Sequence, residues 1–134
     1  MPKRVMVFGT FDILHKGHLN FFKQAKKHGD ILIAVVARDK NVKKIKGKNP
    51  KNKEIKRLLN IALLKIVDFA VIGNIKDPYK IIEEYKPSTI CLGYDQNSYT
   101  DKLKEELKKR KLRTKIIRLK AYKEHKYKSS KLRK

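Results

Sequence analysis

VMVFGTFDILHKGH, residues 5–18, is the most informative stretch of this chain. Its first four residues are apolar and predict a buried β-strand, and Gly9, which follows them, predicts a tight turn. His15 and His18 come next, where a helix is predicted to begin near Gly17. A strand, a glycine turn and a helix N-terminus bring backbone N–H groups and the positive end of the helix dipole to one point. The stretch therefore predicts the phosphate-binding corner of an α/β fold.

Strand and helix signals alternate along the rest of the chain. Predicted strands cover residues 3–8, 31–37, 68–72, 89–92 and 114–119, and predicted helices cover residues 17–27, 52–64, 79–85 and 101–110. A lysine-rich loop, residues 42–47, is predicted after the second strand. Almost continuously apolar strands are typical of a parallel sheet that is covered on both faces and connected by right-handed crossovers. The predicted fold class is α/β, a Rossmann-like three-layer sandwich with a five-stranded parallel sheet, and we expect residues 1–134 to form one domain.

The charge of the chain is extreme, since 36 Lys and Arg against 13 Asp and Glu give a net charge of +23 at pH 7. Residues 102–134 alone hold 16 basic and three acidic side chains. Such a charge predicts incidental, salt-dependent binding of polyanions and makes a nucleic-acid-binding protein an alternative reading. Few aromatic residues are interleaved with the basic ones, and no helix-turn-helix, zinc-finger or ribonucleoprotein motif is present. A general lysine bias explains the charge equally well.

Other classes of protein are excluded by composition. No apolar run is long enough to cross a bilayer, and no signal-peptide pattern is present, so we expect a cytoplasmic protein with no membrane partner. Cys91 is the single cysteine and lies in a predicted strand, which rules out a disulfide framework and a cysteine metal site.

The run GTFDILHKGH, residues 9–18, resembles the signature G-T-F-D-x-x-H-x-G-H of the cytidylyltransferase-like nucleotidyltransferases, and all seven fixed positions are present. In such enzymes a phosphate oxygen of the second substrate attacks the α-phosphorus of a nucleoside triphosphate and pyrophosphate leaves, so the protein supplies position and charge stabilisation. The alternatives are a pair of helix-capping histidines and a cation site built from the histidines and the aspartate. The resemblance implies that the nucleotide is bound by Gly9, Thr10, Phe11, Asp12, His15, Lys16, Gly17 and His18, with His15 and His18 catalytic.

Two basic segments extend the resemblance. In the family, a lysine of the loop after the second strand reaches the triphosphate, which implies a catalytic Lys46 and assigns Lys44 to the phosphate of the second substrate. Arg57, on the second long predicted helix, matches a family arginine near that same phosphate. The alternatives are solvated surface lysines and, for Arg57, a surface ion pair with Glu54.

Two later segments are also similar to the family. LGYDQ, residues 92–96, implies that Gly93 and Asp95 meet the base and ribose, with an ordinary turn and helix cap as the alternative. SSK, residues 129–131, is similar to the family's serine-threonine element, which assigns Ser129 and Ser130 to the phosphates and makes Ser130 catalytic. Tyr122 is a further candidate for the nucleotide pocket.

The same runs suggest the substrates. ARD, residues 37–39, and GYDQ, residues 93–96, are more similar to archaeal FAD synthases than to glycerol-phosphate cytidylyltransferases, and the R-T-E-G-I element of the latter is missing. The resemblance thus implies that ATP and FMN give FAD and pyrophosphate, with CTP and glycerol 3-phosphate or another phospho-alcohol as the alternative. A sugar-phosphate adenylyltransferase is a further alternative, less favoured by these runs. We expect a divalent cation, Mg²⁺ or Co²⁺, to accompany the triphosphate without a metal site built by the protein. We also expect a homodimer that covers Ile61, Leu64 and Ile66.

Overall fold

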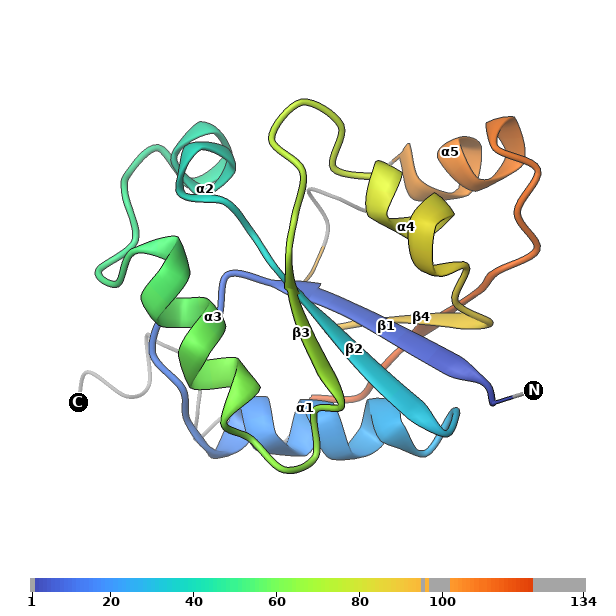
Figure 1. Ribbon diagram of the computed structural model, residues 1–134, viewed down its shortest axis with the longest axis horizontal. Helices are drawn as coiled ribbons and strands as arrows, with labels where there is room; N and C mark the ends of the chain where they lie inside the picture. The colour runs from blue at the N-terminus through green and yellow to red at the C-terminus, as the bar shows by residue number, and fades with distance from the viewer. Residues whose placement is uncertain (1, 95, 97–101, 122–134) are drawn as a thin grey trace.

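The computed structural model describes residues 2–94, 96 and 102–121 (Figure 1). Its elements, in chain order, are β1 (Arg4–Gly9), α1 (Lys16–Lys26), β2 (Ile31–Val36), α2 (Asp39–Lys46), α3 (Glu54–Ala62), β3 (Phe69–Ile72), α4 (Lys80–Tyr85), β4 (Thr89–Leu92), α5 (Leu103–Lys109) and β5 (Lys115–Arg118). The five strands form one parallel sheet in the order β3-β2-β1-β4-β5. The predicted fold class is confirmed.

Two hydrophobic clusters cover the two faces of the sheet. Side chains alternate along β1, so Val5 and Val7 point to one face while Met6 and Phe8 point to the other. The first cluster packs α1 and α3 against the sheet, and the second packs α4 and α5 (Figure 1). All four of these β1 side chains are buried, which explains why the strand reads as an uninterrupted apolar run.

Residues 42–47 were predicted as a loop, and this prediction is wrong, because α2 covers most of them. The helix has Asp39 in its first turn and basic residues in its last, which suits the helix dipole. Gly47 ends it in the left-handed conformation, with a φ of 79°, and donates its N–H to Lys43 O at 2.8 Å. Val42 is the one buried residue of α2, so the sequence shows no apolar stripe that would have indicated a helix.

The three residues expected at a dimer interface are not an exposed group. Ile61 is completely buried in the core, and Leu64 and Ile66 pack against that core. The exposed apolar side chains of this region are instead those of Ile55, Leu59 and Leu63, which is 82% exposed. Within the described part of the chain, no helix has the length and apolar character needed to span a membrane.

Candidate active site

The predicted site residues gather at the carboxyl edge of the sheet. The chain winds from β1 to β2 and β3 on one side, and then returns to β4 and β5 on the other. The order of the strands therefore reverses between β1 and β4, and ligands of open α/β sheets bind in the crevice at such a switch point. Residues 9–18 leave the end of β1 directly at this crevice, and the turn after β4 borders it from the other side.

Phe11 shapes the turn after β1. Its backbone adopts a positive φ of 51°, and its ring packs under Gly9, where a Cβ would lie 2.6 Å from the ring. The same ring contacts Phe22 at a centroid distance of 5.2 Å and the edge of His18 at 5.8 Å. Phe11 is 5% exposed, so its side chain belongs to the core and supports the His18 ring. Only its backbone remains a candidate for contact with a nucleotide.

The two histidines form a capping box at the N-terminus of α1. His15 is the N-cap, and its Nδ1 accepts from Gly17 N at 3.0 Å, while His18 Nδ1 accepts from His15 N at 3.3 Å. The ring centroids are 4.1 Å apart. Because both Nδ1 atoms act as acceptors, each neutral ring carries its proton on Nε2. The capping arrangement thus sets the tautomer that can donate to a phosphate oxygen.

The charge state of His18 is set by its surroundings. Burial of the ring, followed by electrostatic interactions with His15 and Lys46, lowers the pKa of His18 to about 4. His18 is therefore neutral at pH 7 and acts as a hydrogen-bond donor without a net charge.

Lys46 and Lys44 lie on different sides of α2. Lys46 follows the buried Val42 by four residues and so shares its side of the helix, whereas Lys44 is only two residues away and points elsewhere. Both lysines are exposed. Both ammonium groups remain candidates for contact with phosphates. Lys16, in the first turn of α1, is exposed beside the histidines.

Asp12 binds the chain 40 residues later. Its two carboxylate oxygens accept from Lys51 N at 2.7 Å and Asn52 N at 2.8 Å, and its own carbonyl accepts from Asn52 Nδ2 at 2.8 Å. Burial alone would raise the pKa of the Asp12 carboxyl, but these hydrogen bonds outweigh it and hold the pKa below the usual value. Asp12 thus anchors the α2–α3 loop to the turn after β1.

Arg57 is buried beneath the same loop and is 0% exposed. Its guanidinium donates to three carbonyls and to the carboxylate of Asp39: Asn52 O at 2.9 Å, Thr10 O at 2.9 Å, Ala37 O at 2.8 Å and Asp39 Oδ1 at 2.6 Å. The alternative, a surface pair with Glu54, is absent among these contacts, because Glu54 pairs with Arg38 at 2.8 Å. In this arrangement Arg57 joins three loops of the carboxyl edge and does not face a phosphate site.

The turn after β4 is held by two residues that the sequence analysis did not assign. Gln96 binds the backbone of Phe8 and Gly93 through its side-chain amide, and Arg118 of β5 donates to Gly93 O at 2.8 Å. Gln96 lies in the LGYDQ run, so its position was visible in the sequence although its role was not. Four predicted site residues lie outside the described part of the chain: Asp95, Tyr122, Ser129 and Ser130.

The residues of the site do not build a metal cage. In the described ranges, no three His, Cys, Asp or Glu side chains gather to hold an ion. Both Asp12 oxygens accept backbone N–H groups, and both histidine Nδ1 atoms are acceptors of the capping box. This donor set fits a divalent cation that is carried by the phosphates of a substrate, as Mg²⁺ usually is.

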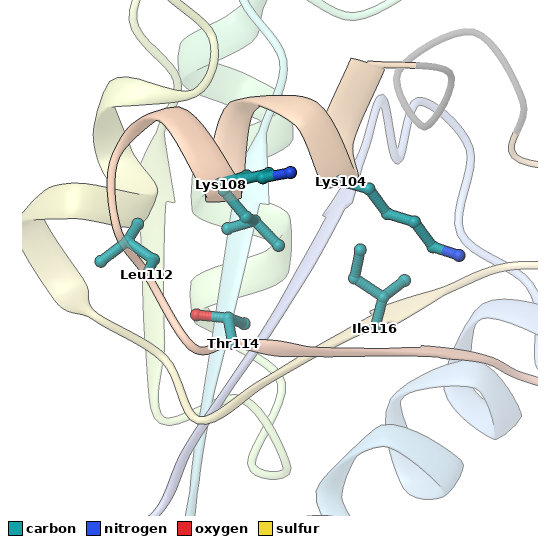
Figure 2. Close-up of a pocket in the computed structure, with 6 residues that line it drawn as sticks. Lys104, Lys108, Leu112, Thr114 and Ile116 are labelled. Carbon is teal, nitrogen blue, oxygen red and sulfur yellow. The ribbon is translucent and has the colours of Figure 1, made fainter.

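A shallow pocket of about 370 Å³ lies between α5 and β5, away from residues 9–18. Figure 2 shows Lys104 and Lys108 on α5 above Thr114 and Ile116. A second pocket of about 250 Å³ shares Lys104 and Ile116 with it and extends to Arg118. Neither pocket is lined by the histidines, so the residues of the signature lie outside both of them.

A parallel sheet with this strand order, and a pair of histidines at the helix N-terminus beside its switch point, defines an enzyme of the nucleotidyltransferase class. The chain belongs to the Cytidylyltransferase-like family, whose model matches residues 6–134.

Its relatives narrow the comparison. The chain is 50% identical over 127 residues to a protein named FAD synthase from Archaeoglobus profundus, covering 95% of this chain and 81% of the relative. It is 46% identical over 119 residues to the FAD synthase of Aciduliprofundum boonei, covering 89% of this chain and 79% of the relative.

Two solved structures are similar as well. One is a Thermoplasma volcanium protein called a lipopolysaccharide core biosynthesis protein, 43% identical with a TM-score of 0.84, covering 91% of this chain and 99% of that one. The other is a pantoate-β-alanine ligase from Francisella tularensis, with a TM-score of 0.59 and 20% identity, covering 88% of this chain and 59% of that one. The ligase shares the fold alone.

Proposed function

We propose that this protein is an FMN adenylyltransferase, which makes FAD and pyrophosphate from ATP and FMN. The observation that carries the proposal is the paired-histidine cap at the switch point, in a chain that is 44–50% identical to several archaeal proteins named FAD synthase. The fold alone would not specify the reaction, because one fold hosts many activities. The similarity to these relatives supplies the acceptor and the nucleotide.

In the proposed reaction a phosphate oxygen of FMN forms a bond to the α-phosphorus of ATP, and the bond from that phosphorus to the β-phosphate oxygen breaks. Negative charge grows on the equatorial oxygens and on the departing pyrophosphate. The Nε2–H groups of His15 and His18 donate to these oxygens, and the positive end of the α1 dipole adds to the field.

Lys46 supplies the cationic charge on the triphosphate side, because its side chain is exposed and its charge is among those that lower the pKa of His18. We keep Gly93 and Asp95 as contacts of the base and ribose, and Ser129, Ser130 and Tyr122 as contacts of the phosphates and the nucleotide. A divalent cation, Mg²⁺ or Co²⁺, enters with ATP as part of that substrate. Lys44 stays a candidate for the phosphate of the second substrate. Arg57 is left out of this proposal, because its guanidinium is buried and donates to backbone carbonyls and to Asp39.

The experiment is pyrophosphate release by the purified protein with ATP or CTP, each offered with FMN, glycerol 3-phosphate, phosphocholine or a sugar phosphate. Release that requires ATP and FMN supports the proposal. Release with CTP and a phospho-alcohol, or with ATP and a sugar phosphate, would replace it. The sugar-phosphate arm is included because the similar Thermoplasma volcanium structure is described as a lipopolysaccharide core protein.

We also propose that the protein works as a cytoplasmic homodimer. The apolar side chains of Ile55, Leu59 and Leu63 lie four residues apart along one side of α3 and its end, and are 58%, 55% and 82% exposed. A second copy is one way to cover such a stripe. Light scattering coupled to gel filtration tests the dimer, and the variant Leu63→Lys should yield monomers if this face is the interface.

A further inference from the structure

Three of the four neighbouring strand pairs end at the carboxyl edge in the same way. In each of them, a carbonyl at the end of one strand accepts from the first amide beyond the neighbouring strand: Gly9 O from Ala37 N at 3.0 Å, Val36 O from Gly73 N at 2.9 Å, and Leu92 O from Leu119 N at 2.8 Å. These bonds simply continue the parallel ladder by one step. The fourth pair, β1 and β4 at the switch point, ends differently.

The side-chain amide of Gln96 stands where β1 and β4 would form their next ladder bond. The register, which pairs Val7 with Cys91, would bring Phe8 O to Gly93 N if the ladder continued. Instead, Gln96 Nε2 donates to Phe8 O at 2.7 Å, and Gln96 Oε1 accepts from Gly93 N at 2.7 Å. One amide thus satisfies both backbone groups and spaces the strands apart where the crevice begins.

Arg118 fixes the same turn from β5. The turn is closed by Gln96 N, which donates to Gly93 O at 3.2 Å. Arg118 Nη1 donates to Gly93 O at 2.8 Å and to Gln96 O at 3.0 Å. A guanidinium holds several acceptors in a fixed plane, so Arg118 limits the movement of the turn that carries the Gln96 amide.

We propose that Gln96 and Arg118 are positioning residues that hold the crevice between β1 and β4 open for the nucleoside triphosphate. The inference rests on the proposed function, because it assumes that the triphosphate binds between residues 9–18 and the turn after β4. Phe8 directly precedes the first of these segments and Gly93 opens the second, so the amide couples the two walls of the nucleotide site. Without it, Phe8 O and Gly93 N would pair directly and narrow the crevice.

The decisive variant is Gln96→Glu. It keeps the size of the side chain and an acceptor for Gly93 N, but it puts a carboxylate oxygen against Phe8 O where an N–H donor stood. We expect this variant to bind a non-hydrolysable ATP analogue with an affinity at least about tenfold lower than that of the unaltered protein, as measured by titration calorimetry. The KM for FMN should stay within about twofold, since the acceptor contacts are unchanged.

Gln24→Glu is the matched control. The Gln24 amide also bridges backbone, with Nε2 donating to Lys120 O at 2.9 Å and Oε1 accepting from Lys120 N at 3.1 Å, but it joins α1 to the chain after β5. The substitution Gln24→Glu should leave the affinity for the ATP analogue unchanged, while it lowers the Tm by about as much as Gln96→Glu does. Equal losses of affinity in the two variants, or an equal rise in the KM for FMN in Gln96→Glu, would overturn the inference.

A second pair of variants tests Arg118. Arg118→Ala should weaken binding of the analogue, and Arg118→Lys should recover part of it, because an ammonium group still donates to one carbonyl of the turn. Unchanged binding in both variants would remove Arg118 from the proposal.

The binding assay also separates this inference from the proposed function. ATP and CTP analogues are both titrated into the unaltered protein, and the one bound more tightly is used for every variant. A protein that binds the analogue but makes no FAD would refute the proposed reaction. The binding data for Gln96→Glu would still decide the role of Gln96. A protein that binds neither analogue would refute both.

Discussion

Replacement of Arg57 by methionine is expected to destabilise the protein strongly without a selective effect on the acceptor. Methionine fills similar space but donates nothing, so the carbonyls of Thr10, Ala37 and Asn52 lose a charged donor in a buried site. At about 1 kcal/mol for each hydrogen bond, the loss is about 3 kcal/mol. The pair with Asp39 adds little to this, because that carboxylate is 33% exposed.

The measurement is urea denaturation followed by circular dichroism, with thermal melting as a second readout. A loss of about 3 kcal/mol corresponds to a fall in Tm of roughly 10–15 °C for a chain of this size. Arg57→Lys should lose most of the same stability, since one ammonium group cannot span three carbonyls. Arg38→Met is the control, because Arg38 is 32% exposed and should cost about 1 kcal/mol or less. A loss below about 1 kcal/mol in Arg57→Met, together with a raised KM for the phosphorylated acceptor, would refute the buried role and restore the phosphate contact.

Three further predictions concern the histidine cap. His15→Asn keeps a good N-cap residue but removes the Nε2–H donor. The free energy of unfolding should therefore stay within about 0.5 kcal/mol of the unaltered protein, while turnover falls about a hundredfold. A loss of turnover below about threefold would show that His15 is not a donor in the reaction. Gly17→Ala would put a Cβ 2.6 Å from His15 Cε1 and displace that ring. Turnover should therefore fall at least about tenfold with little change in Tm. Unchanged turnover would contradict the requirement for this position of the His15 ring. The pKa of His18 lies below that of the unfolded chain, so the stability due to its burial is complete above about pH 6.5 and is lost as the pH falls toward 4. Urea titrations between pH 7 and 4 should show that the free energy of unfolding falls by about 2–3 kcal/mol less in His18→Asn than in the unaltered protein. An equal fall in the two proteins would refute the effect of His18 burial.

Much of the fold was readable from local patterns. The strand over residues 89–92 was predicted with its observed ends, and the other strands were predicted within about two residues, because buried parallel strands are short apolar runs with polar flanks. The helix α2 was missed because Val42 is its one buried residue, so the sequence shows no apolar residues at helical spacing there. The histidines at the start of α1 were found because a motif of seven fixed residues is local and specific.

The roles of Asp12 and Arg57 were beyond the sequence. An aspartate within the signature predicts a ligand contact. For Arg57, the resemblance predicts a contact with the phosphate of the second substrate, with a surface pair with Glu54 as the alternative. The structure gives these side chains other partners: the backbone N–H groups of Lys51 and Asn52 for Asp12, and buried carbonyls for Arg57. Which backbone groups need a partner depends on how the loops meet, and no local pattern records that.

Periodicity and the spacing of the signature are short-range properties, so the order of the elements, the parallel sheet and the position of His15 and His18 were contained in the amino-acid sequence. The support of the crevice is long-range. Arg57 meets Thr10 across 47 residues, and Gln96 meets Phe8 across 88. Hydrogen bonds between side chains and distant backbone form only where folding has left a donor or an acceptor without a ladder partner, and therefore only the assembled sheet reveals them.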